Sequence, residues 1–369
     1  MTTKKDSRNY ALDLVRIFAF CCVVSVHFFL HTPFYNITVQ GGRMYIATLM
    51  RTFFMICVPL FLMLSGYLMR KKKASKQYYL KLTGILVEYL LASLCCAIYG
   101  VLISGMPEDM LLYLKETIFN LFAYSTAPYS WYVEMYIGLF LLIPYLNILY
   151  DAMDGQKGKQ KLILTLLLLT SIPGITNIIS SDLGGYTMEL RILPQGWIGF
   201  YPITYYFIGA YLSEYPLKLR RTTNIALILL TAVVSGSLCY WKSYGTLFEA
   251  GVWQMHQSGL VAIQAVLVFS FLSQISLKPT GVIAKTASRL SKLCFSAYLV
   301  SYIFDHNLYA RFGMNEIQPV YRLEYFVVTV PLVIVLSLAL SAVIQIVYRL
   351  LCHAAKSIRR SRKPVSEIG

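Results

Sequence analysis

Residues 11–31 read ALDLVRIFAFCCVVSVHFFLH, and this stretch decides what kind of fold the chain can adopt. It is long enough to cross the hydrocarbon core of a bilayer as one α-helix, which takes about 20 mostly apolar residues. It is too long for the apolar core of a signal peptide, and it lacks a convincing cleavage site of small residues. We therefore expect it to remain in the protein as a first membrane span.

The composition extends this expectation to the whole chain. Of the 369 residues, 57% are hydrophobic and 14% are charged, and the mean hydropathy is +0.60. A soluble domain cannot bury that much apolar surface. The pattern predicts an all-α, polytopic transmembrane helical bundle with about ten spans. We place these spans at 11–31, 45–69, 80–104, 129–150, 162–180, 197–215, 222–241, 252–275, 293–309 and 323–350, and we expect the amphipathic segment 108–123 to be interfacial or re-entrant.

The net charge is +16, from 33 basic and 17 acidic residues. Most Lys and Arg residues fall in alternate loops and at the chain ends, which the positive-inside rule assigns to the cytoplasm. Both termini are therefore expected there. The chain divides into an N-terminal segment 1–10, a transmembrane domain 11–350 and a basic tail 351–369. Because the charge lies in loops and no RNA- or DNA-binding signature accompanies it, we expect no nucleic-acid partner.

The eight cysteines give no sign of a metal or disulfide site. Nearly all of them lie inside apolar runs, and none forms a CxxC pair. The sequence therefore predicts small buried side chains at these positions, without a zinc site, another metal site or a disulfide framework.

Two ionisable residues share one face of the first span. Arg16 and His27 have ten residues between them. Eleven steps of an α-helix are close to three turns, so both side chains point the same way, about 16 Å apart along the axis. Asp13 lies one turn before Arg16 and can hold its guanidinium in place. An imidazole deep in a span is suited to taking a proton from a hydroxyl. The plainer alternatives stay open: Arg16 as a residue that snorkels to the interface, and His27 as a core histidine satisfied by a neighbouring helix.

This first span resembles that of the membrane-bound acyltransferase family 3, whose hallmark is an Arg and a His with this spacing in helix one. Four further segments resemble the family in their order and spacing. They are VPLFLMLSGYLMRKKK (58–73), SWYVEMYIGLFLLIPYLN (130–147), YYFIGAYLS (205–213) and SKLCFSAYLVS (291–301). Two features depart from the family pattern. Ser301 stands where the family often has a His, and Lys76 and Lys81 replace a paired arginine motif.

The resemblance implies an integral membrane acyltransferase. Such an enzyme moves an acyl group, usually acetyl from acetyl-CoA, to a hydroxyl of a cell-envelope glycan or its lipid-linked precursor. The implied setting is the plasma membrane of a bacterium. The implied partners are acyl-CoA, the glycan acceptor and membrane lipids.

Roles for individual residues follow from this resemblance together with their chemistry. We expect His27 to act as the general base, with covalent acceptance of the acyl group by His27 as the alternative. We expect Arg16 to orient the donor and Asp13 to support Arg16. Glu134 and Glu88 can orient His27 or bind a substrate hydroxyl, or they can simply join two helices by a hydrogen bond. The nucleotide end of acyl-CoA would be attracted by a basic cluster that the positive-inside rule also explains by itself. This cluster consists of Arg70, Lys71, Lys72, Lys73, Lys76 and Lys81.

Other functions stay open at this point. A transporter or flippase for a glycan or lipid also needs buried charges, although no internal repeat with paired broken helices is evident. A membrane glycan polymerase would need a large outer loop, which the sequence does not show. Among the remaining ionisable residues, Arg51 is expected at the outer interface. His256 and His306 are expected to be structural rather than catalytic.

Overall fold

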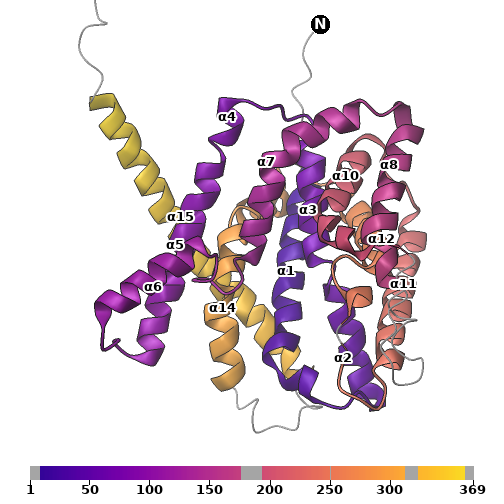
Figure 1. The fold of residues 1–369 in the computed structure, drawn as a ribbon, viewed down its shortest axis with the longest axis horizontal. Helices are drawn as coiled ribbons and strands as arrows, with labels where there is room; N and C mark the ends of the chain where they lie inside the picture. The colour runs from indigo at the N-terminus through magenta and orange to yellow at the C-terminus, as the bar shows by residue number, and fades with distance from the viewer. Residues whose placement is uncertain (1–8, 176–192, 250, 312–322, 362–369) are drawn as a thin grey trace, which may run out of the picture.

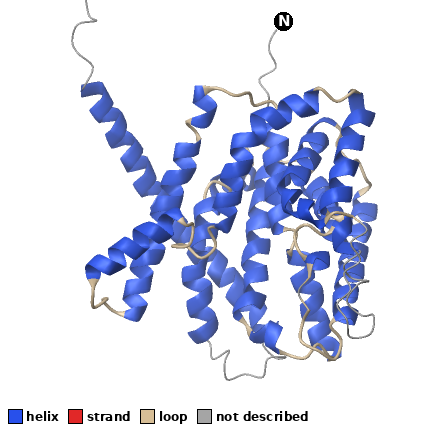
Figure 2. Cartoon of the chain, viewed as in Figure 1, coloured by secondary structure: helices blue, strands red, loops and turns tan. Residues whose placement is uncertain are grey.

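The computed structural model describes residues 9–175, 193–249, 251–311 and 323–361, and this part of the chain is almost entirely helical (Figure 2). Within it, extended backbone pairs only at two isolated bridges, Thr38 with Leu247 and Val39 with Tyr244. The α-helices are α1 (Ala11–His31), α2 (Gly41–Phe54), α3 (Cys57–Met69), α4 (Lys76–Tyr79), α5 (Leu82–Ser104), α6 (Met110–Phe122), α7 (Trp131–Asp151), α8 (Gly155–Thr170), α10 (Tyr201–Glu214), α11 (Arg221–Lys242), α12 (Gly259–Ser273), α13 (Val282–Leu290), α14 (Cys294–Arg311) and α15 (Phe326–Ser361). Three short 3-10 helices are η1 (Pro33–Asn36), η2 (Gln195–Phe200) and η3 (Val252–Gln254).

The predicted helical membrane bundle is confirmed. In the described residues, 7 helical stretches are long and apolar enough to span a membrane: Ala11–His31, Gly41–Met69, Lys76–Ser104, Trp131–Asp151, Arg221–Lys242, Val252–Ser273 and Leu323–Ala355. The other three predicted spans correspond to α8, α10 and α14, which are shorter or more polar. The end of one of them, 176–180, lies outside the described residues, as do residues 1–8 and 362–369 of the predicted terminal segments. The count of ten spans and the cytoplasmic termini therefore stay predictions.

Helix α1 lies in the middle of the bundle (Figure 1). It contacts α2, α3, α12, α14 and α15, so residues on several of its faces are buried. The described chain begins and ends at the same end of the bundle, which also carries the loop with Lys71 and Lys73 and the short helix α4 (Figure 1). We call this the lysine-rich end and the opposite one the far end. Helix α6 has no buried residue and stands against α5 on the flank of the bundle, with Tyr113 donating a hydrogen bond to the Ala97 carbonyl over 3.0 Å.

Two prolines shape the helices that line the interior. Proline has no N–H to donate and its ring crowds the carbonyl four residues earlier, so that carbonyl is left without its helical partner. For Pro59 the freed carbonyl is that of Met55, at the break between α2 and α3. This carbonyl accepts a hydrogen bond of 3.0 Å from Nδ1 of His256. For Pro144, inside α7, it is that of Phe140, which accepts a hydrogen bond of 2.6 Å from the Tyr78 hydroxyl. Each freed carbonyl thus anchors a side chain from another part of the bundle.

A close crossing of α3 and α10 fixes one wall of the interior. A Cβ added at Gly66 would lie 1.9 Å from the Tyr206 carbonyl oxygen, and one at Gly209 would lie 1.9 Å from the Met63 carbonyl oxygen. Only glycine lets two helices approach this closely. The two glycines therefore hold α3 in place, and α3 carries much of the cavity described next.

Candidate active site

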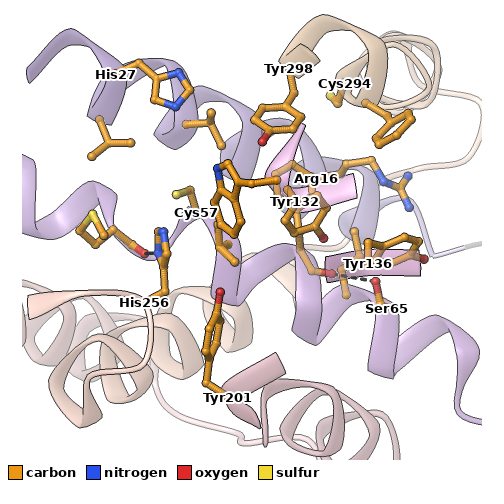
Figure 3. A pocket seen from close by; sticks show the side chains of 18 of the residues that line it. Arg16, His27, Cys57, Ser65, Tyr132, Tyr136, Tyr201, His256, Cys294 and Tyr298 are labelled. Carbon is orange, nitrogen blue, oxygen red and sulfur yellow. Dashed lines mark hydrogen bonds between the residues drawn. The ribbon is translucent and has the colours of Figure 1, made fainter. Parts of the chain in front are cut away.

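A cavity of about 820 Å³ lies inside the bundle beside α1. Its walls come from α1, α3, α5, α7 and α14, together with α2, Tyr35 of η1, the start of α10 and the loop after η3. Figure 3 shows Arg16 and Ser65 toward one end, and His27 and His256 toward the other. Residues that lie between the two ends include Cys57, Tyr132 and Tyr298. The cavity therefore runs along α1, past both residues that the sequence singled out on one face of that helix.

The lysine-rich end of the cavity is built around Arg16. Its side chain is 30% exposed, and its guanidinium lies 3.5 Å from the Asp13 carboxylate. Asp13 is buried, and its Oδ1 accepts a hydrogen bond of 2.6 Å from the Ser291 hydroxyl. Lys292, the next residue, is exposed and also lines the cavity. Asp13 thus joins α1 to the segment before α14 and holds Arg16 at the cavity wall.

His27 faces a buried carboxylate that the sequence analysis did not select. Its Nδ1 lies 3.6 Å from Oδ2 of Asp305, on α14, and Asp305 is fully buried. Within the described residues, neither Nδ1 of His27 nor Oδ1 of Asp305 has a hydrogen-bond partner. A shift of less than 1 Å would join the two groups, and catalytic hydrogen bonds are often this long before substrate binds. A carboxylate that accepts a hydrogen bond from Nδ1–H keeps the proton on Nδ1, so the lone pair of Nε2 is available as a base.

Tyr129 and His31 complete the surroundings of Asp305. The Tyr129 hydroxyl donates to Oδ2 of Asp305 over 2.6 Å, and its ring lies 3.8 Å from the His27 ring between centroids. His31 Nε2 lies 2.6 Å from the same hydroxyl. Because the single Tyr129 proton points to Asp305, His31 must donate to the Tyr129 oxygen, which assigns its proton to Nε2. Asp305 is therefore fixed within a network of aromatic and imidazole groups.

Asp305 could have been found from the sequence, because it is a carboxylate inside the predicted span 293–309. The rule that an ionisable group within a span faces the interior applies to it as well as to Glu88 and Glu134. Its distance of 278 residues from His27 in the sequence leaves no spacing signal that links the two, so the pairing itself needed the fold.

Arg51 and His256 lie in the bundle rather than at its rim. Arg51 was expected at the outer interface, but it is 3% exposed and lines the cavity, from the last turn of α2 just before the break at Met55. His256 also lines the cavity, and its ring stacks on Trp131 with centroids 6.0 Å apart. Both residues thus add polar groups to the far half of the cavity.

The two carboxylates proposed beside His27 are placed differently. Glu88 lines the cavity, and its Oε2 accepts a hydrogen bond of 2.8 Å from the Ser296 hydroxyl. Glu134 is exposed and does not belong to the cavity lining. The reason is helical geometry, since Glu134 is two residues after Tyr132 and therefore on the opposite side of α7. We therefore do not retain Glu134 among the candidate catalytic residues.

The members of the basic cluster differ in burial and pairing. Arg70 is buried, and its guanidinium pairs with the carboxylates of Asp151 and Glu214, the latter at 2.8 Å. Burial lowers the pKa of Arg70, but the two carboxylates outweigh this and raise it above its ordinary value. Arg70 therefore joins the ends of α3, α7 and α10. Because its charge is already compensated, it is a poor candidate for binding the phosphates of the donor. The other members are all exposed: Lys71, Lys72, Lys73, Lys76 and Lys81.

Ser301, which replaces the family's histidine, is buried and donates a hydrogen bond of 2.9 Å to the Tyr298 carbonyl. It is not part of the cavity lining. His306 is exposed and stacks on Tyr302, with centroids 5.3 Å apart.

The described residues contain no group of three or more His, Cys, Asp or Glu side chains arranged to hold a metal ion.

Comparison with known proteins assigns the chain to a family. A family model described as an acyltransferase domain, that of acyltransferase family 3, matches residues 9–345, nearly the whole chain. Neither the curated proteins nor the solved structures give a significant match. The matched range contains all the residues that line the cavity.

Proposed function

The chain belongs to acyltransferase family 3, and on this premise we propose that it transfers an acetyl group from acetyl-CoA to a hydroxyl of a cell-envelope glycan or its lipid-linked precursor. As a multi-pass membrane acyltransferase, it needs a site that admits both an acyl donor and an acceptor. The observation that carries the proposal is that Arg16 and His27 line one cavity from positions about 16 Å apart along α1.

The donor enters, in this proposal, from the lysine-rich end. Acyl-CoA carries several phosphate charges at its nucleotide end and a thioester at the end of a long uncharged arm. Exposed lysines such as Lys76 and Lys81 attract the nucleotide end. Lys81 directly precedes α5, and two residues of the first turns of α5, Ile85 and Glu88, line the cavity. Arg16, held by Asp13, then orients the donor where the arm passes into the bundle.

His27 performs the proton transfers. Its Nε2 takes the proton of the acceptor hydroxyl while the oxygen attacks the thioester carbonyl. The carbon–sulfur bond breaks as the ester bond forms, and the imidazolium returns its proton to the departing thiolate, which gives free CoA. Asp305 stabilises the imidazolium and orients the ring through Nδ1, as the carboxylate does in a Ser-His-Asp triad. The largely apolar walls limit hydrolysis of the thioester by water.

The setting we propose is the plasma membrane of a bacterium, with the lysine-rich end in the cytosol, where acyl-CoA is made. The predicted transmembrane domain 11–350 is then the catalytic bundle, and the predicted segments 1–10 and 351–369 are cytosolic. Family membership does not favour the transporter or flippase alternative.

The test is acceptor-dependent release of CoA by the purified full-length protein. The protein in lipid nanodiscs is given acetyl-CoA with and without a mixture of envelope glycans, and free thiol is measured together with labelled acetyl on the glycan. We expect both products to appear in equal amounts when acceptor is present. The absence of CoA release with every acceptor, together with glycan movement across the membrane of proteoliposomes that contain the protein, would contradict the proposal and support a transporter.

A further inference from the structure

Arg51 is a buried cation on the wall of the cavity. Its Nε donates to the Tyr35 hydroxyl over 3.0 Å, and one terminal nitrogen lies 3.4 Å from the Gln254 carbonyl oxygen. The guanidinium also lies over the rings of Phe248 and Tyr35, at 5.0 and 5.8 Å from their centroids. The other terminal nitrogen has a weak acceptor, the Met255 sulfur, at 3.9 Å. All these neighbours are neutral.

The charge of Arg51 is therefore uncompensated within the described residues, where no carboxylate lies within 4.0 Å of it. A buried, unpaired cation is costly, and such a group inside a membrane protein usually faces a substrate or a pathway. Arg70 provides the contrast, because it is also buried but is paired with two carboxylates and lies outside the cavity. Arg51 thus has no charge partner among the described residues, and a bound ligand can supply the anion that compensates it.

The surroundings of Arg51 fit a sugar. One turn after Arg51, the Met55 carbonyl accepts the Nδ1–H of His256. This assigns the His256 proton to Nδ1 and leaves Nε2 as an acceptor for a hydroxyl. The rings of Trp131, which stacks on His256, and of Tyr201 also line the cavity. Flat aromatic faces with a few polar groups are what an orienting subsite for a polar ligand needs.

We infer that Arg51 binds an anionic group of the acceptor, a carboxylate or phosphate carried by the sugar, and thereby sets which hydroxyl reaches His27. This inference rests on the proposed function. A guanidinium matches either anion with two parallel hydrogen bonds. Because Arg51 and His27 line the same cavity from adjoining helices, the anion is held at one point of the sugar and the reacting hydroxyl at another.

The experiment compares three acceptors with the purified full-length enzyme and acetyl-CoA. They are a galacturonate tetrasaccharide, the same tetrasaccharide with its carboxylates reduced to neutral groups, and the reduced form bearing one phosphate monoester. We expect the wild type to prefer the carboxylate or the phosphate form over the neutral one by about 10- to 100-fold in kcat/KM, the size of a charged hydrogen bond. The favoured form identifies the source of the anion. Equal use of all three would overturn the inference.

Variants separate ligand binding from a structural role. Arg51→Gln should remove the preference by slowing only the anionic acceptors, and Arg51→Lys should keep part of it. Arg43→Gln is the matched control on the same helix, because Arg43 is exposed and outside the cavity. It should behave as wild type. An equal loss with neutral and anionic acceptors in Arg51→Gln would mean that Arg51 only joins η1 to η3, and would overturn the inference.

Binding without donor distinguishes this failure from failure of the proposed function. The thermal unfolding temperature is measured with each tetrasaccharide in wild type and Arg51→Gln. If no acetyl is transferred to any acceptor, the proposed function fails, yet selective stabilisation of wild type by an anionic tetrasaccharide would still support the Arg51 site. If neither anionic form stabilises wild type more than the neutral form does, the Arg51 site is contradicted.

Discussion

The two ends of the cavity hold their charges in different ways. At the lysine-rich end, Arg16 is 30% exposed and 3.5 Å from its carboxylate, and Lys292 is exposed to solvent. In the far half, His27 and Asp305 face each other with side chains 13% and 0% exposed. Arg51 is buried, and its hydrogen-bond partners among the described residues are neutral.

This difference indicates that the two ends of the cavity have different functions. Exposed charges act over long distances and tolerate a moving ligand, but salt screens them and each contributes little. Enclosed groups are held in one orientation in a low-dielectric setting, where each interaction is stronger and a proton can be transferred reliably. The lysine-rich end is suited to capturing a donor, and the far half to performing chemistry on an acceptor. Four predictions test this contrast, in order of decreasing effect.

The largest effect is expected from His27→Ala. Removing the general base should lower kcat by about 10²- to 10⁴-fold with little change in the KM for acetyl-CoA. The measurement is acceptor-dependent CoA release, with His353→Ala as the matched control because His353 is exposed on α15. Full activity of His27→Ala at normal expression would contradict the proposed chemistry.

Asp305→Asn should come next. The amide keeps the size of the side chain but removes the charge that stabilises the His27 imidazolium, so we expect kcat to fall by about 10- to 100-fold. Because Asp305 acts through His27, Asp305→Asn should have little further effect in a His27→Ala background. Additive losses in the double variant would mean that Asp305 has a separate structural role.

Arg16→Gln should act on the other end of the cavity. Loss of one charge-assisted contact is expected to raise the KM for acetyl-CoA by about tenfold while kcat changes less. Arg70→Gln is the informative comparison, because Arg70 is paired with Asp151 and Glu214. It should lower the thermal unfolding temperature without raising the donor KM. The reverse pattern would exchange the roles assigned to the two arginines.

The smallest effect is expected from the exposed lysines. Replacing Lys71, Lys72 and Lys73 by alanine should raise the donor KM by about threefold at low salt, and the difference should vanish at high salt. Lys115→Ala, on the flanking helix α6, serves as the control. A loss that persists at high salt would indicate a direct contact with the donor instead of long-range attraction.

Much of the bundle could be predicted from apolar periodicity and charge placement, since a spanning helix must satisfy its own backbone hydrogen bonds. The shared face of Arg16 and His27 was also predictable, because both lie on one helix whose geometry is fixed. Two of the predicted spans correspond to α8 and α10, which are 16 and 14 residues long, whereas a spanning helix takes about 20 residues. Much of α10 is buried by other helices, so it does not need a lipid-facing apolar stretch of full length.

The rest of the site depends on contacts between distant parts of the chain. Positive-inside placement does not distinguish the exposed Lys71 from the buried Arg70, whose partners Asp151 and Glu214 come from other helices. Arg51 lies in the last turn of α2, before the break between α2 and α3, and the sequence gives no indication of which neighbours this turn meets. The pairing of His27 with Asp305 likewise requires α1 and α14 to be packed side by side.

The central claim is that one cavity brings a donor held near Arg16 to the imidazole of His27. The most direct measurement is an electron cryo-microscopy structure of the full-length protein with CoA in nanodiscs. We expect the phosphates beside Arg16 and Lys292, with the uncharged arm extending along α1 and the thiol next to His27. CoA bound elsewhere on the protein, or a thiol that ends on the side of α1 away from His27, would contradict the claim.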